Sequence, residues 1–181
     1  MAKKETKKVE FDGRIWPNLL DYNVNMDAQL ISKSNFIFGA STLILVFILN
    51  KLATPNLLKT STLANLPMFI LLVGSFFSSL LSIMIVLPRM RLFSKKQRIN
   101  KDIFYYKNIR KFYTRASYHA YIKDLPTDNK RIGEAYANQI YSLATNVIPY
   151  KFKLLKISGW ILMSSIFLSF FSYFLTYFLL P

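Results

Sequence analysis

Residues 66–87 read LPMFILLVGSFFSSLLSIMIVL and contain no charged side chain. As a helix that rises ~1.5 Å per residue, this run extends roughly 33 Å, which matches the hydrocarbon thickness of a bilayer. Pro67 lies in what would be the first turn, where proline is tolerated, and Pro88 follows the last apolar residue. The stretch therefore predicts a membrane-spanning helix.

Two further apolar runs lie on either side of this helix. Residues 36–52, FIFGASTLILVFILNKL, form a shorter run, in which Lys51 can extend its ammonium group to the interface. Residues 157–180, ISGWILMSSIFLSFFSYFLTYFLL, are uncharged, with Trp160 and Tyr177 near opposite ends as interfacial anchors. The sequence therefore predicts an all-α membrane protein with three transmembrane helices.

The charge distribution predicts how these spans are oriented. The chain holds 24 Lys and Arg residues against nine Asp and Glu, a net charge of +15, and sixteen of the basic residues lie in residues 88–156. The positive-inside rule then places the N-terminus and residues 88–156 in the cytoplasm, and the loop 53–65 outside. Four segments are predicted: a cytoplasmic N-terminal segment and helix (1–35), a transmembrane helical hairpin (36–87), a basic cytoplasmic helical hairpin (88–156) and a third transmembrane helix (157–181).

The cytoplasmic segments show helical spacing of their own. Apolar and small residues recur at helical intervals over 98–123 and again from Ile132 to Val147, with a turn cluster between them. These two stripes predict an antiparallel helical hairpin beneath the membrane. Pro149 is expected to kink or interrupt the chain before the third span. Pro17 is expected to open a helix that continues into the first span.

Small and hydroxyl residues recur along the second and third spans. Gly74, Ser78 and Ser82 are spaced by four residues, and the third span carries Ser158, Ser165, Ser169, Ser172 and Thr176. The favoured interpretation is close helix–helix packing, which small residues permit in lipid. The alternative is a weakly polar stripe that lines a pore in a homo-oligomer.

The residue inventory points away from catalysis. The chain has no cysteine, and His119 is its only histidine, so a two-histidine zinc site cannot form within one chain. No glycine-rich phosphate loop or nucleophile elbow is present, and neither a cofactor nor a metal is expected. The spans lack ionisable residues, apart from Lys51 at the end of the first, which argues against a proton-coupled transporter or a voltage sensor. The protein is therefore predicted to be no enzyme.

Residues 104–124, FYYKNIRKFYTRASYHAYIKD, interleave aromatic and basic side chains. The favoured interpretation is a basic amphipathic helix against anionic lipid, followed by a pocket for a small phosphate-bearing ligand. Nucleic-acid binding is the least favoured, because no nucleic-acid motif is present and the segment lies close to the bilayer. Several aromatic residues fit a packing stripe, which leaves mainly Lys107, Arg110, Lys111 and Arg115 for an anion.

The order of several short elements resembles the transmembrane effector family of bacterial Pycsar antiphage systems. The matching stretches run from about residue 18 to 165: Asp27-Ala28-Gln29-Leu30 before the first span, Leu87-Pro88-Arg89 after the second, Ile103-Phe104-Tyr105-Tyr106, Tyr121 to Leu125, and Gln139-Ile140 with Tyr150-Lys151 before the third. The chain departs from the family pattern at two places. Gln29 stands where the family has lysine, and the lysine–tyrosine order is altered at Tyr150-Lys151.

This resemblance implies a multi-pass effector of the bacterial inner membrane, with a cytoplasmic N-terminus. It would sense a cyclic pyrimidine nucleotide, cCMP or cUMP, made by a partner cyclase, and then impair the membrane to halt infected cells. The expected partners are the lipid bilayer, further copies of the chain and this nucleotide, with no nucleic acid. The candidate ligand-binding residues are Asp27, Lys107, Arg110, Lys111, Tyr113, Arg115 and Gln139.

Two alternatives remain open at the level of sequence. One is a structural or scaffolding membrane protein, whose basic cytoplasmic helices dock anionic lipid or a cytosolic partner. The other is a different conflict-system membrane effector, similar to the two-span modules found beside oligonucleotide cyclases. A nucleotide cyclase gene next door would favour the effector over the scaffold.

Overall fold

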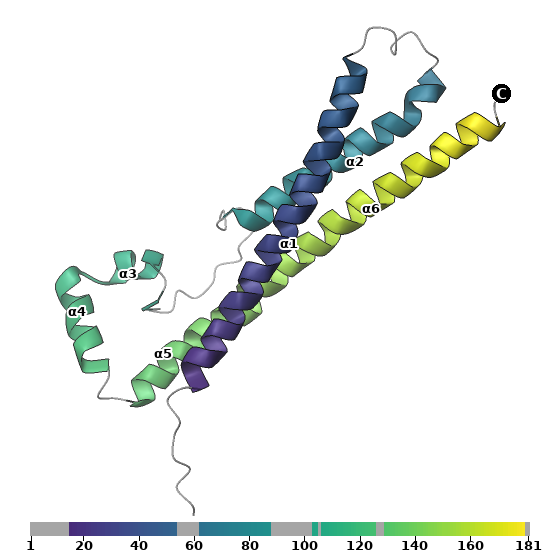
Figure 1. Cartoon of the computed structure of the whole chain (residues 1–181). Coiled ribbons are helices and arrows are strands. Elements are labelled where there is room, and N and C mark those ends of the chain that lie inside the picture. The colour runs from purple at the N-terminus through teal and green to yellow at the C-terminus, as the bar shows by residue number, and fades with distance from the viewer. Residues whose placement is uncertain (1–14, 54–61, 88–102, 105, 126–128, 180–181) are drawn as a thin grey trace, which may run out of the picture. The chain divides into compact units, whose positions relative to one another are not determined.

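The computed structural model describes residues 15–53, 62–87, 103–104, 106–125 and 129–179, and these residues contain helices but no strand (Figure 1). The elements are α1 (Ile15–Leu52), α2 (Thr62–Val86), α3 (Tyr106–Phe112), α4 (Arg115–Asp124), α5 (Asn129–Ser142), the π-helical turn η4 (Leu143–Val147) and α6 (Ile148–Leu179). Three helices are long and apolar enough to cross a membrane, as predicted.

The first helix is much longer than a single span. α1 has 38 residues and begins two residues before Pro17. Proline is tolerated there because the first N–H groups of a helix have no intrahelical partner. The prediction of a helix that opens near Pro17 and continues into the first span is therefore confirmed.

The approach to the third span is interrupted as predicted, but the chain stays helical. The π-helical turn η4 lies between α5 and α6 and ends two residues before Pro149. Proline donates no N–H and crowds the carbonyl four residues earlier, so the i→i−4 pattern fails there, and a wider turn accommodates it. The Thr145 hydroxyl donates to the carbonyl oxygen of Tyr141 at 2.6 Å within this turn.

By its internal contacts the chain divides into two compact units. The first comprises Met1–Asn25 with Lys96–Asn146, and we call it the basic unit. The second comprises Met26–Lys95 with Val147–Pro181, and we call it the span unit, because it holds the apolar stretches of all three candidate spans. The four segments predicted from the sequence remain a prediction.

In the span unit, α2 runs antiparallel to both α1 and α6 (Figure 1). Ser34 and Ser41 of α1 contact Ser82 and Ser78 of α2 respectively, so residue numbers rise along one helix and fall along the other. Ser158, near the start of α6, contacts Ser82, near the end of α2. Ser169, farther along α6, donates a hydrogen bond to Pro67, near the start of α2. This antiparallel order agrees with three successive crossings of a membrane.

The surface of the span unit is apolar and aromatic. Phe36 is 79% exposed, and Phe47, Phe167 and Phe170 are each 71% exposed. Large side chains of this kind are normally buried in water-soluble proteins, whereas lipid solvates them without cost. The exposed apolar surface therefore fits a bundle that is surrounded by hydrocarbon.

The basic unit corrects one prediction about secondary structure. Residues 98–123 were expected to form a single amphipathic helix, but the described part breaks at Tyr113–Thr114 into α3 and α4. Thr114 and Ser117 form a reciprocal capping box, which satisfies the free N–H groups at the start of α4. The expected packing position Ala116 is exposed, and α4 has no fully buried residue.

Candidate functional site

Serine hydroxyl groups occupy the centre of the span unit. Ser34, Ser41, Ser78, Ser82 and Ser158 are all 0% exposed. The Ser158 hydroxyl oxygen lies 2.9 Å from that of Ser82 and 3.1 Å from that of Ser78. Ser34 donates to the carbonyl oxygen of Ser82 at 2.8 Å, and Ser41 lies 3.2 Å from the Ser78 hydroxyl. All three helices therefore meet in one hydrogen-bonded layer, which we call the serine layer and define by these five residues.

Ser158 joins the layer most extensively. Its hydroxyl lies 2.9 Å from the carbonyl oxygen of Ser78, and the Ser78 hydroxyl lies 3.0 Å from the carbonyl oxygen of Ser158. Such reciprocal contacts require the two backbones to approach closely, which only small side chains allow. The α2–α6 interface is therefore held by hydroxyl groups in place of large apolar side chains.

Glycine extends this close approach along the α2–α6 interface. A Cβ atom placed on Gly74 would overlap the side chain of Ser165. Farther along, the Ser169 hydroxyl donates to the carbonyl oxygen of Pro67 at 2.9 Å. The packing interpretation of the small residues in the second and third spans is thus confirmed for Gly74, Ser165 and Ser169 as well as for the serine layer.

One member of the buried polar set has no hydrogen bond. Ser75 is 0% exposed, and its hydroxyl oxygen has no hydrogen-bond partner among the described residues. A buried hydroxyl without a partner costs free energy, because it has lost its hydrogen bonds to water. The polar interior of the span unit is therefore only partly satisfied.

Asp27 and Lys151 form an ion pair near one end of the span unit. The Lys151 ammonium nitrogen lies 2.8 Å from Oδ2 of Asp27, in a directed hydrogen bond, and 2.7 Å from Oδ1, without one. The Lys151 side chain is 15% exposed and that of Asp27 is 23% exposed. Each residue precedes a member of the serine layer by seven positions, Ser34 in α1 and Ser158 in α6. The pair therefore joins α1 to α6 two turns from the serine layer.

The predicted ligand-binding residues fall in different parts of the molecule. Asp27 lies in the span unit, where Lys151 pairs with it. Arg110, Lys111 and Arg115 lie in the basic unit with exposed side chains, and Lys107 has a side chain outside the described residues. The exposed cations remain accessible to an anion, whereas the Asp27 carboxylate already has a cation.

The two remaining candidates are partly covered. Gln139 is half-buried in α5, and Tyr113 is half-buried next to the start of α4. The Tyr113 ring packs edge-to-face on Tyr118 and Tyr121, with ring centroids 5.7 and 5.9 Å apart. Tyr113 therefore packs inside the basic unit, as the helical stripe predicted, and presents less of its ring for stacking on a base.

Further aromatic contacts hold the basic unit together. The Tyr118 hydroxyl donates to the carbonyl oxygen of Ile103 at 3.1 Å, and Ile103 is only 3% exposed. The Phe104 and Tyr136 rings lie with centroids 5.0 Å apart. Lys111 lies over the ring of Phe112, 5.3 Å from its centroid. The aromatic residues of the 104–124 segment therefore stabilise the basic unit by packing, while its cations are exposed.

The sequence reading missed three residues that the structure brings together. The sequence predicts no role for Lys151 beyond its place in the family element Tyr150-Lys151, and none for Ser34 or Ser41 of α1. A signal was present, because Asp27, Ser34, Ser41 and Ile48 are each seven residues apart in α1. A seven-residue spacing returns to the same face of a helix that packs in a left-handed bundle.

Among the described residues, no group of three or more His, Asp or Glu side chains could hold a metal ion. The family model described as the Pycsar effector protein domain matches residues 22–178, which include most of the first candidate span and all of the other two. No curated protein and no solved structure matches the chain.

Proposed function

The chain belongs to the Pycsar effector family, and from this membership we propose that it is a membrane antiphage effector that senses a cyclic pyrimidine nucleotide and then impairs the inner membrane. The serine layer is the observation that carries the mechanism. Three candidate spans are held together by hydroxyl groups, and α1 and the run α5–η4–α6 each continue from the basic unit into the span unit. A ligand bound to the basic unit would thus act on helices that also form the bundle.

The free energy of the interhelical hydrogen bonds is comparable to the free energy that differential ligand binding can supply. Interhelical hydrogen bonds in membranes contribute about 0.6 kcal/mol each on average, so the handful in this bundle amounts to about 3 kcal/mol. A ligand that binds one packing state about 100-fold more tightly shifts the equilibrium between states by about 2.7 kcal/mol. The buried Ser75 hydroxyl has no hydrogen-bond partner among the described residues, so a second packing state that supplied one would be favoured. Differential binding of one nucleotide per chain would therefore supply a free energy of the same size as these hydrogen bonds.

The ligand would bind through the exposed cations of the basic unit. Arg110 and Arg115 offer planar groups that match a phosphate, with Lys111 beside them. We propose that α4 and α5 form a cytoplasmic hairpin that carries these cations, with the N-terminus on the same side. The protein would act as a homo-oligomer without catalysis, cofactor or nucleic acid, and the altered packing would expose the small-residue faces of α2 and α6 to a leak pathway.

The test is dye release from liposomes that contain the purified full-length chain. Addition of cCMP or cUMP, but not cAMP or cGMP, is expected to release the dye, and calorimetry on detergent-solubilised protein is expected to detect binding of the same nucleotide. Arg110→Ala and Arg115→Ala are each expected to weaken binding about tenfold or more, the effect of a charge-assisted hydrogen bond.

Lys123→Ala is the matched control, because Lys123 is also an exposed cation of α4 but is not a predicted ligand contact. Equal loss in Lys123→Ala would indicate general electrostatic attraction. If no cyclic pyrimidine nucleotide binds and none releases dye, nucleotide gating is wrong. Binding of anionic vesicles by the basic unit without any leak would then favour the scaffolding alternative.

A further inference from the structure

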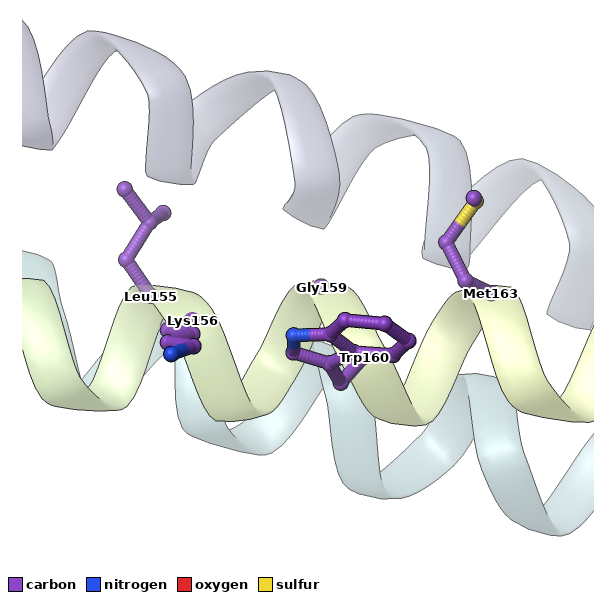
Figure 2. A pocket seen from close by; sticks show the side chains of 5 residues that line it. All are labelled: Leu155, Lys156, Gly159, Trp160 and Met163. Carbon is purple, nitrogen blue, oxygen red and sulfur yellow. The ribbon is translucent and has the colours of Figure 1, made fainter.

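A shallow groove of about 250 Å³ lies along α6 where the third span begins (Figure 2). Leu155, Lys156, Gly159, Trp160 and Met163 line it. Figure 2 shows Leu155 and Met163 on either side of Gly159, with Lys156 and Trp160 along one edge. The groove exists because Gly159 has no side chain.

The neighbouring helix closes one side of the groove. A Cβ atom placed on Gly159 would lie 3.7 Å from Cδ1 of Ile37 in α1, within ordinary contact distance. Trp160 is 64% exposed and Met163 is 68% exposed, so the other side of the groove is open to the surroundings. An elongated apolar group can therefore lie over Gly159 between Leu155 and Met163.

The groove carries a cation at one end. Lys156 is the last charged residue of the chain, and residues 157–181 hold none, so its ammonium group marks the boundary of the hydrocarbon. Lys151 is paired with Asp27, whereas among the described residues no carboxylate is paired with the exposed Lys156. The Trp160 indole lies one turn deeper and offers an N–H donor beside an apolar ring.

We propose that this groove binds one anionic phospholipid. The phosphate of its headgroup would accept hydrogen bonds from the Lys156 ammonium and from the Trp160 indole N–H. One acyl chain would lie over Gly159 between Leu155 and Met163. Because acyl chains of every lipid are apolar, apolar contact alone gives no selectivity, and the preference for an anionic headgroup would come from Lys156. The lipid would lie in the leaflet at the Lys156 end of the third span.

The two tryptophans of the chain, Trp16 and Trp160, make a direct test possible. The full-length protein is reconstituted in phosphatidylcholine vesicles that contain brominated phosphatidylglycerol or, separately, brominated phosphatidylcholine. Trp160→Phe leaves Trp16 as the only tryptophan. The difference in quenching between the unaltered protein and this variant therefore gives the quenching of Trp160. We expect an apparent affinity about fivefold higher for the brominated phosphatidylglycerol, the effect of one lysine at an anionic surface.

Lys156→Gln is expected to reduce this preference to nearly onefold, and Lys153→Gln serves as the matched control. Lys153 is exposed one turn earlier on the same helix but does not line the groove. Gly159→Leu is expected to reduce quenching by both brominated lipids, with circular dichroism used to verify that the helix content is retained.

Equal quenching by the two headgroups would overturn the proposal. Equal losses in Lys153→Gln and Lys156→Gln would also overturn it, because they would show diffuse attraction to the bilayer surface. No nucleotide is present in this experiment, so its outcome is independent of the gating proposed above.

Discussion

The span unit buries many serine side chains beside a few aliphatic ones such as Ile85, whereas the basic unit packs aromatic side chains on one another and exposes its cations. In the span unit Ser34 and Ser158 are 0% exposed while Phe36 is 79% exposed. In the basic unit Ile103 is buried and the tyrosines pack on one another, while Lys111 and Arg115 are exposed. Burial of apolar surface lowers the free energy in water but not in lipid. Close packing and hydrogen bonds therefore determine which side chains lie inside the bundle.

The largest expected effect comes from filling the closest contact of the span unit. Gly74→Leu is expected to destabilise the α2–α6 interface by about 3 kcal/mol, the upper part of the range for overpacking, because even a Cβ atom there overlaps Ser165. Unfolding in mixed micelles with increasing sodium dodecyl sulfate would measure it.

Gly39 provides the matched control for this change. A Cβ atom on Gly39 meets nothing within 4 Å, so Gly39→Ala is expected to be neutral or to stabilise α1 by up to about 1 kcal/mol. Gly74→Ala should destabilise the bundle in the same assay. Equal changes in stability for Gly39→Ala and Gly74→Ala would contradict the conclusion that only Gly74 lies in a close helix–helix contact.

The second prediction breaks the ion pair between Asp27 and Lys151. Asp27→Ala is expected to cost about 2 kcal/mol, between the values for exposed pairs and for fully buried ones, because the Lys151 side chain would lose its carboxylate partner in a mostly covered position. A double-mutant cycle with Lys151→Met measures the coupling, and the double variant should be more stable than Asp27→Ala alone. Strictly additive losses would show that the pair contributes nothing.

The third prediction tests the serine layer itself. Ser158→Ala removes the hydrogen bond to the carbonyl oxygen of Ser78 and the contacts with the hydroxyl groups of Ser78 and Ser82, and we expect a loss of about 1–2 kcal/mol from these interhelical hydrogen bonds. Ser164→Ala is the control, because Ser164 lies on the same helix but is exposed. If the two variants unfold at the same detergent concentration, hydroxyl pairing does not hold the bundle together.

The smallest effect is expected in the basic unit. Thr114→Ala removes the capping box at the start of α4 and should cost about 0.5–1 kcal/mol, since the cap is exposed. Hydrogen exchange should accelerate at residues 115–118 and leave the span unit unchanged. Thr114→Ser keeps the hydroxyl and should restore protection, so an acceleration of the same size in Thr114→Ser would argue against the capping role.

Some of this architecture was readable from particular residues. The apolar runs predicted all three spans, and the spacing of Gly74, Ser78 and Ser82 predicted where helices touch. The break between α3 and α4 was missed, although Thr114 and Ser117 have the spacing of a capping box. The helical periodicity on both sides hid it, because two short helices in sequence keep nearly the same pattern as one long helix.

The ligand-binding set was less predictable. The exposure of Arg110 and Arg115 agrees with the prediction, but the Asp27 side chain has Lys151 as its partner 124 positions along the chain. Nothing local to either residue indicates the other. Contacts of this range depend on how two helices are placed side by side, and a periodic pattern within one helix carries no such information.

By itself the sequence determined that this protein is helical, has three segments long and apolar enough to span a membrane and belongs to the Pycsar effector family, because the length and hydropathy of an apolar run are local properties of the chain. Only the tertiary structure decided which face of α1 meets the small-residue faces of α2 and α6. Large apolar side chains surround the rest of each span, so hydropathy alone does not set the rotation of the helices about their own axes. That rotation is settled by the close approach of Gly74 to Ser165 and by the hydroxyl groups around Ser158.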